Sequence, residues 1–186
     1  MQRAVLFDLD GTLLNRDASV DCFLAGQYKR YEQVMFHVPF DVFHRRFKEL
    51  EKRGYVWKDK VYAQMIEEFN LHGVSADELL GDYVSRFHEH CVPFDSLTHV
   101  LTSLKEQSLA LGLISNGRTA FQLANVEALG ITDFFDTVLI SEQEDLRKPD
   151  RAIFERACER TGVKAEACLF VGDHRKMMWR LQGGQE

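Results

Sequence analysis

Near its start the chain reads Ala4-Val5-Leu6-Phe7-Asp8-Leu9-Asp10-Gly11-Thr12, a short apolar run that ends in two carboxylates and a glycine. A continuous apolar run of this length is typical of a strand buried on both faces of a parallel sheet. Three further runs of this kind lie at 109–115, 135–141 and 167–173. Helical patterns cover 119–129 and 151–161, the second opening after Asp150 as an N-cap. This alternation predicts an α/β fold, with helices on both faces of a parallel sheet.

The stretch from 16 to 93 is different, because it lacks strand-like runs and carries aromatic and aliphatic residues at helical spacing. Two such stripes are Tyr28, Tyr31, Met35 and Val61, Met65, Phe69. We expect about four helices here, forming an all-helical cap inserted after the first strand. The expected division is a core at 1–15 and 94–174, a cap at 16–93 and a distinct C-terminal tail at 175–186.

Composition argues against several classes of partner. The chain of 186 residues has a net charge of −6 and 28% charged residues, which gives no basic footprint for nucleic acid. No apolar stretch approaches the length of a membrane span or of a signal peptide. The four cysteines form no CxxC pair, so we expect neither a disulfide framework nor a zinc site. We therefore expect a cytoplasmic protein that binds neither nucleic acid nor a membrane.

Asp8 and Asp10 stand two residues apart at the end of the first predicted strand, and Gly11 lets the chain turn sharply after them. One carboxylate could attack an electrophile while its neighbour transfers protons. Phosphoryl transfer suits such a pair, because a carboxylate nucleophile forms an acyl phosphate that water can later open. The alternative is an acidic turn that only reverses the chain, and this motif alone does not decide between the two.

Functional groups collect at the carboxyl ends of the strands in a parallel sheet. The predicted ends here are Asp8, Ser115, Ser141 and Asp173. The ordered motifs are Asp8-Leu9-Asp10-Gly11-Thr12, Ser115-Asn116-Gly117, Lys148-Pro149 and Gly172-Asp173. In type and order they resemble the four motifs of the haloacid dehalogenase (HAD) superfamily, and the insertion falls where that family's helical C1 cap lies. The resemblance implies the HAD fold, a Rossmann-like parallel sheet with an inserted cap.

The resemblance also implies a metal site and a nucleophile. Asp8 would be the nucleophile, and Asp10 would be the general acid and base. Mg²⁺ would be held by the Asp8 carboxylate, the backbone carbonyl of Asp10 and Asp173, which are the oxygen ligands that this hard ion prefers.

Two further motifs would contact the transferred group. Ser115 would hydrogen-bond the phosphoryl oxygens, helped by the backbone N–H groups of Asn116 and Gly117 at the start of a helix. Ser115 could at the same time be a plain N-cap of that helix. Lys148 would offset negative charge on the phosphoryl group and on Asp8.

The implied function is Mg²⁺-dependent hydrolysis of a small phosphorylated metabolite through an aspartyl-phosphate intermediate. Asp10 favours a phosphatase over a dehalogenase, because dehalogenation has no leaving oxygen to protonate. A phosphomutase and a catalytically weak binding or regulatory protein remain as alternatives. Arg16, Lys58 and Arg118 are the candidate substrate contacts, although long basic side chains more often extend into solvent.

The tail from 175 to 186 departs from the family pattern directly after His174. Relatives carry a second acid a few residues later, where this chain has Met177-Met178-Trp179. Each of these residues has a single codon, and a shift by one base makes the interior triplets encode Asp-Val. We therefore hypothesise a frameshift that puts Met178 in place of the acid and weakens metal-dependent activity about 10 to 100-fold. Resequencing around the codon for His174 tests it.

The same hypothesis affects the edge of the sheet. If the usual next strand is missing, the strand within 167–173 becomes an apolar edge that invites pairing with another chain. The oligomeric state therefore stays open, with edge-strand pairing as one possibility.

Overall fold

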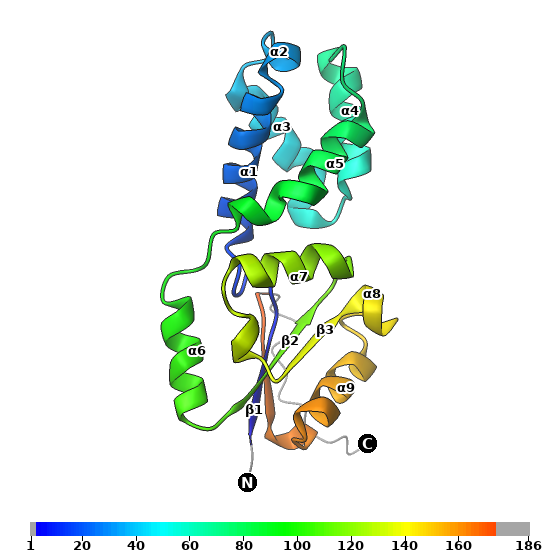
Figure 1. The fold of residues 1–186 in the computed structure, drawn as a ribbon. Coiled ribbons are helices and arrows are strands. Elements are labelled where there is room, and N and C mark those ends of the chain that lie inside the picture. Colours follow the sequence, from blue (N-terminus) through cyan, green and yellow to red (C-terminus); the bar gives the residue numbers. More distant parts are fainter. Residues whose placement is uncertain (1–2, 174–186) are drawn as a thin grey trace. The chain divides into compact units, whose positions relative to one another are not determined.

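The computed structural model describes residues 3–173 and confirms the parallel α/β fold (Figure 1). The strands are β1 (Ala4–Phe7), β2 (Ala110–Ser115), β3 (Thr137–Ile140) and β4 (Cys168–Val171). They form one sheet in the order β3-β2-β1-β4, and all three neighbouring pairs are parallel. Each of the four predicted runs contains one of these strands. The predictions for His174 and for the tail lie outside the described residues.

The chain divides into two compact units. Among the described residues, the core comprises 3–16 and 91–173, and the cap comprises 17–90, inserted between β1 and β2. Within the core, the two crossings to the cap run side by side. The N–H of Asn15 donates to the carbonyl of Val92 at 2.8 Å, and an isolated antiparallel β-bridge joins Leu14 to Pro93.

Helices of the core cover the sheet. They are α6 (Leu97–Glu106), α7 (Thr119–Ala128), α8 (Ser141–Glu144) and α9 (Arg151–Thr161), with 3-10 turns η3 (Thr132–Phe134) and η4 (Ala165–Ala167). The predicted start of α9 is confirmed, because the Asp150 side chain accepts a hydrogen bond from the N–H of Ala152 at 3.0 Å. Ile153 and Ala157 of α9 pack with Leu6 and Ile114 of the sheet.

Burial explains why β1 and β2 appear in the sequence as unbroken apolar runs. Every residue of both strands is buried, as expected for central strands with helices on both faces. β4 lies at the edge, and within residues 3–173 it pairs only with β1. Leu169 of β4 is 47% exposed. No helix in this described range is long and apolar enough to cross a membrane.

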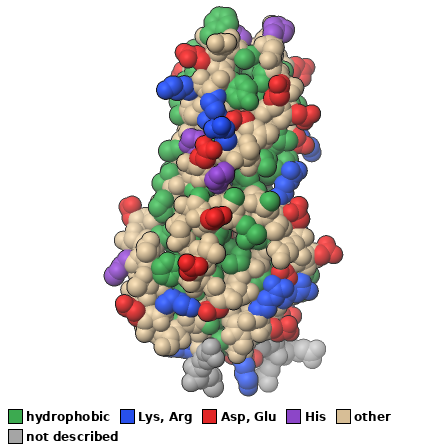
Figure 2. Space-filling model, in the orientation of Figure 1, with side chains coloured by type: hydrophobic (Ala, Val, Ile, Leu, Met, Phe, Trp, Pro, Cys, Tyr) green, Lys and Arg blue, Asp and Glu red, His purple; other side chains and the backbone are tan. Residues whose placement is uncertain are grey.

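The cap is all-helical, as expected. Its helices are α1 (Arg16–Arg30), α2 (Glu32–Met35), α3 (Phe40–Glu51), α4 (Lys58–Phe69) and α5 (Ala76–Arg86), with 3-10 turns η1 (Lys52–Gly54) and η2 (Phe87–His90). Aromatic rings fill its interior, where Phe23 packs edge-on against Tyr83 at 4.9 Å between centroids. Acidic and basic side chains are interspersed on the face shown in Figure 2.

Candidate active site

Asp8 directly follows β1, and its backbone N–H donates to the carbonyl of Val171 in β4 at 2.8 Å. Its carboxylate accepts the N–H of Leu9 at 2.7 Å and forms an ion pair with the ammonium group of Lys148. The two side chains are 14% and 3% exposed. Burial raises the pKa of Asp8 above its ordinary value, the charge of Lys148 counteracts this, and nearby Asp10 adds to the rise. Lys148 therefore helps to keep a poorly hydrated carboxylate ionised.

The side chain of Asn116 fixes the backbone at Lys148. Asn116 Oδ1 accepts the Lys148 N–H at 2.9 Å, and Asn116 Nδ2 donates to the Lys148 carbonyl at 3.0 Å. The ammonium of Lys148 also lies 5.5 Å from the centroid of the Phe170 ring, within range of a cation–π interaction. This role of the Asn116 side chain was not predicted, because only its backbone N–H was expected to act. The pair of bonds holds the segment that presents Lys148 to Asp8.

Gln122 of α7 connects Asp10 to Ser115. Its Nε2 lies 2.7 Å from Asp10 Oδ2 and 2.8 Å from Ser115 Oγ, and its Oε1 accepts from Asn125 Nδ2 at 3.0 Å. Ser115, Gln122 and Asn125 are each at most 3% exposed. Gln122 and Asn125 were not among the predicted site residues, although two polar residues three positions apart mark one face of the predicted helix. Because Ser115 Oγ accepts this bond, its own O–H is left to donate to another oxygen.

The start of α7 agrees with the helical pattern predicted at 119–129, but Ser115 does not cap the helix. The helix begins at Thr119 with Arg118 as its N-cap residue, so the interpretation of Ser115 as an N-cap is wrong. The Gly117 N–H, an expected contact of the phosphoryl group, donates to Ser141 Oγ at 2.9 Å. Ser141 was a predicted strand end to which no role was assigned. Its hydroxyl accepts the hydrogen bond from the Gly117 N–H.

Asp173 follows β4 and lies against the turn after Asp10. Gly11 has a φ of +78°, and a Cβ built there would come within 2.6 Å of Asp173 Oδ2. Gly172 lies next to Asp8, because its Cβ would be 3.4 Å from the Cβ of Asp8. The chain after β1 and the chain after β4 therefore lie close together here.

These groups fit a hard divalent cation. Within residues 3–173, no three His, Cys, Asp or Glu side chains form a cluster that could enclose a metal. Two carboxylates follow neighbouring strands here instead, because Asp8 comes directly after β1 and Asp173 lies against Gly11. Carboxylate oxygens are the ligands that a hard divalent cation prefers.

The contact between Gly11 and Asp173 leads to a test. Gly11→Ala should lower the free energy of unfolding by about 1–3 kcal/mol, because alanine is strained at positive φ and its Cβ meets Asp173. Displacing Asp173 should also weaken Mg²⁺ binding by about tenfold or more. Urea denaturation and calorimetric titration with Mg²⁺ measure the two effects.

Gly130→Ala is the matched control for this variant. Gly130 has a φ of +66° and no atom within 4 Å of a built Cβ. Alanine at this position is therefore strained at positive φ, but its Cβ meets no other atom. It should lose about 1 kcal/mol and bind Mg²⁺ as the unmodified protein does. If Gly11→Ala bound Mg²⁺ as tightly as the unmodified protein, Asp173 would not be a ligand of the metal.

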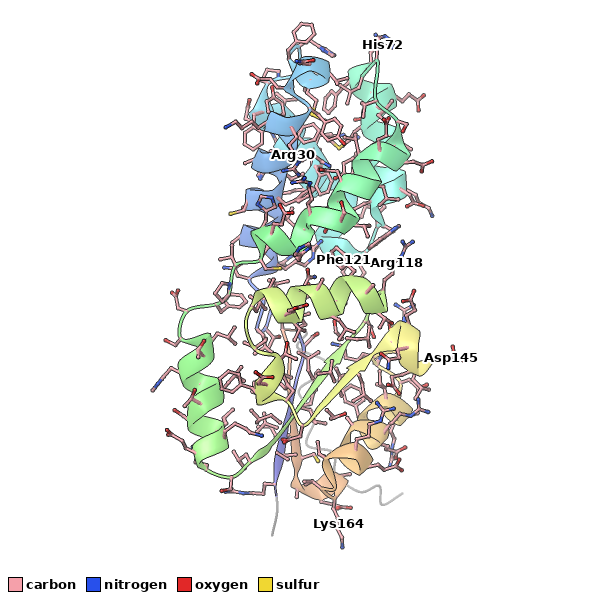
Figure 3. The ribbon with its side chains drawn as sticks, viewed as in Figure 1. Arg30, His72, Arg118, Phe121, Asp145 and Lys164 are labelled. Atoms are coloured by element: carbon pink, nitrogen blue, oxygen red, sulfur yellow. The ribbon has the colours of Figure 1, made fainter. Side chains whose placement is uncertain are left out.

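The three candidate substrate contacts lie in different places. Lys58 is 2% exposed inside the cap, with its Nζ 2.9 Å from Glu51 Oε2. The expectation that Lys58 meets substrate or solvent is therefore wrong, because a buried carboxylate already satisfies its charge. Arg16 is the first residue of α1 and is partly buried. Arg118 is exposed beside α7 and is labelled in Figure 3.

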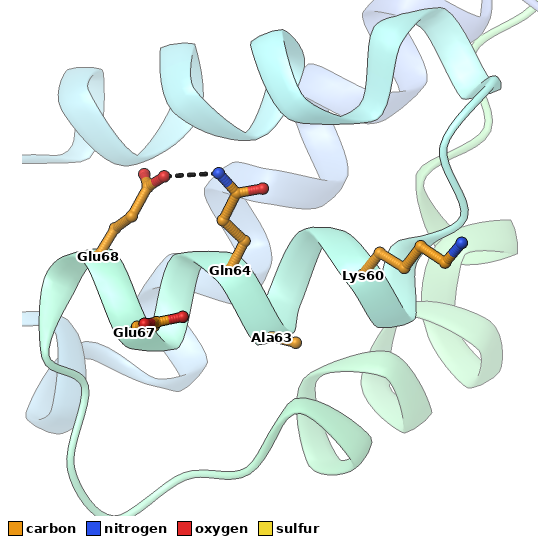
Figure 4. A pocket seen from close by; sticks show the side chains of 5 residues that line it. All are labelled: Lys60, Ala63, Gln64, Glu67 and Glu68. Carbon is orange, nitrogen blue, oxygen red and sulfur yellow. Dashed lines mark hydrogen bonds between the residues drawn. The ribbon is translucent and has the colours of Figure 1, made fainter.

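A hollow on the surface of the cap is separate from these groups. It lies along α4 and is lined by Lys60, Ala63, Gln64, Glu67 and Glu68 (Figure 4). Glu68 accepts a hydrogen bond from Gln64 at 2.7 Å and is held by Arg46 at 2.6 Å. A lining with two carboxylates and one lysine, on a single helix, does not suit a phosphate ester.

Comparisons with known proteins agree with this geometry. The model of the haloacid dehalogenase-like hydrolase family matches residues 5–178. The chain is 31% identical to ribulose-1,5-bisphosphate 5-phosphatase of Halopiger xanaduensis, over 93% of this chain and 77% of that protein. It is 28% identical to glyceraldehyde 3-phosphate phosphatase of Methanocaldococcus jannaschii, with the same coverage of both chains.

Solved structures show the same fold. The magnesium-bound HAD-hydrolase YfnB of Bacillus subtilis superposes with a TM-score of 0.75 at 22% identity, over 93% of this chain and 80% of YfnB. Three observations point to the same family: the family model matches most of the sequence, the relatives are phosphatases, and Asp8 forms a buried ion pair with Lys148. The chain therefore belongs to the haloacid dehalogenase-like hydrolase family and is an enzyme of its phosphatase type.

Proposed function

We propose that the protein hydrolyses small phosphomonoesters in a Mg²⁺-dependent reaction through an aspartyl phosphate on Asp8. The observation that carries the proposal is the buried ion pair of Asp8 with Lys148, next to Asp10 and Ser115 at the same edge of the sheet. The phosphatase relatives, which act on phosphorylated small molecules by name, support the substrate class.

In the first step, an oxygen of Asp8 attacks the phosphorus while the bond from phosphorus to the ester oxygen breaks. Asp10 gives its proton to the departing ester oxygen, so the product leaves as a neutral alcohol. Lys148 and the O–H of Ser115 stabilise the negative charge that the phosphoryl oxygens carry in the transition state.

In the second step, Asp10 takes a proton from water as the water oxygen attacks the phosphorus. The bond between phosphorus and Asp8 breaks, which releases inorganic phosphate and restores both carboxyl groups to their starting states. Asp8, Asp173 and the Asp10 carbonyl would hold the cation. Bound Mg²⁺ would offset negative charge on the phosphoryl oxygens.

Removal of the metal tests this proposal. Phosphate release from 4-nitrophenyl phosphate should fall by about 100-fold or more in excess EDTA, because the cation contributes several kcal/mol of charge stabilisation. Added Mg²⁺ should restore the rate, and Ca²⁺, which prefers more ligands at longer distances, should restore less of it. Phosphate release that is unaffected by EDTA would contradict the proposed metal dependence.

The substrate is identified by a panel of sugar phosphates, nucleotides and phosphoglycolate, with products followed by phosphorus NMR. Hydrolysis gives inorganic phosphate from its preferred substrate. Conversion of a sugar phosphate to its isomer, dependent on a bisphosphate primer, would instead identify a phosphomutase.

A further inference from the structure

We infer that Gln122 is a positioning residue that aims the carboxyl group of Asp10 at the reacting ester oxygen. The inference deepens the proposed function and rests on it for the role of Asp10. Its basis is a buried chain of side chains that runs from Cys91 through Asn125 and Gln122 to Asp10, within the core unit.

Each link of this chain has a direction. Burial raises the pKa of Cys91 to about 12, so its sulfur keeps its hydrogen and donates to Asn125 Oδ1 at 3.5 Å. The Asn125 amide is thereby oriented with Nδ2 toward Gln122 Oε1, at 3.0 Å. Gln122 must then present its NH₂ group to Asp10 and Ser115. If its amide were rotated by 180°, its NH₂ group would face the NH₂ group of Asn125, and two donors cannot form a hydrogen bond.

Packing holds Gln122 in this place as well. A Cβ built on Gly117 would come within 3.0 Å of Gln122 Cγ and 3.3 Å of Nε2, so the glycine backbone closes over the side chain. Gln122 is only 3% exposed. Burial and this close packing restrict the Gln122 amide, which holds its Nε2 against Asp10.

The contact distinguishes the two oxygens of Asp10. Oδ2 accepts from the Gln122 amide at 2.7 Å. This contact leaves Oδ1 as the oxygen that Asp10 can turn toward the reacting ester oxygen. An amide does not titrate, so Gln122 keeps the same contact when Asp10 gives its proton and when it takes one back.

Leaving-group dependence tests this role in the full chain. Gln122→Met keeps the volume and removes the donor. Its kcat/KM for phenyl phosphate should fall by about 100-fold, because phenolate needs the proton from Asp10. Its kcat/KM for 2,4-dinitrophenyl phosphate should change little, because that leaving group departs as an anion. The parameter kcat/KM is the right one, since it reports the step in which the ester bond breaks.

Gln107→Met, at an exposed glutamine after α6, is the matched control and should leave both substrates unchanged. Asn125→Leu removes the partner that orients the Gln122 amide. Its kcat/KM should also fall more for phenyl phosphate than for 2,4-dinitrophenyl phosphate, but by a smaller factor than in Gln122→Met. It serves as the second variant if Gln122→Met does not fold. Equal losses on both substrates would reduce Gln122 to a structural residue, and no loss on either would overturn the inference.

A crystallographic comparison separates this inference from the proposed function. The structure of Gln122→Met should show Asp10 in a different rotamer, or in several, while Asp8 and Lys148 stay paired. An unchanged Asp10 would overturn the positioning role. If the unmodified chain releases no phosphate from any substrate, the proposed function fails, and the orientation of Asp10 is still decided by the two structures.

Discussion

Asp8→Asn is expected to lower phosphate release by roughly 10⁴ to 10⁶-fold, the loss that follows removal of a covalent nucleophile in other hydrolases. An amide oxygen is a much weaker nucleophile than a carboxylate and cannot form the acyl phosphate. The rate is measured with Mg²⁺ and 4-nitrophenyl phosphate. Mass spectrometry of acid-quenched protein should find phosphate on the peptide that contains Asp8, and only in the unmodified protein.

Asp95→Asn is the matched control, because Asp95 is an exposed aspartate of the same unit. It should retain full activity. If Asp8→Asn retained activity, or if the trapped phosphate lay on another peptide, the nucleophile would be a different residue. Circular dichroism of both variants shows whether a loss of activity reflects loss of the fold.

The architecture was predictable because it depends on short-range patterns. Central strands of a parallel sheet are apolar on both faces, so β1 and β2 are visible as unbroken runs in the sequence. The N-cap at Asp150 depends on a residue next to the helix that it begins. The parallel order of the strands then brings Asp8, Ser115 and Asp173 to one edge of the sheet.

The rest of the site depends on side chains that are distant in the sequence. Gln122 meets Asp10 across 112 positions, and no local pattern gives that register. The amide of Asn116 is recognisable beside Ser115, but its bond to the backbone of Lys148 depends on how the loop before α9 returns to the sheet. Lys58 was misassigned because its partner, Glu51, is buried by packing between helices of the cap.

Lys148→Met should lower activity by about 100 to 1,000-fold, because a positive charge at the phosphoryl oxygens is lost from a site with little water. It should also lower the free energy of unfolding near neutral pH by about 3 kcal/mol, since it leaves the carboxylate of Asp8 buried without its partner. Uptake of a proton by Asp8 limits this cost. Lys164→Met, at an exposed lysine of the same unit that is labelled in Figure 3, should change neither quantity.

The loss of stability in Lys148→Met should depend on pH in a defined direction. Burial already raises the pKa of Asp8 above its ordinary 3.8, and removing Lys148 takes away the main opposing influence, so the pKa rises further. Ionisation of a carboxyl whose folded-state pKa is raised destabilises the fold, and the deficit should therefore grow as pH increases from about 4 toward neutrality. Urea denaturation across this range, without metal, measures it. The double variant Asp8→Asn/Lys148→Met has no buried charge at this pair and should recover most of the stability near neutral pH. A deficit that is independent of pH, or that persists in the double variant, would show that Lys148 stabilises the fold by packing and not by its charge.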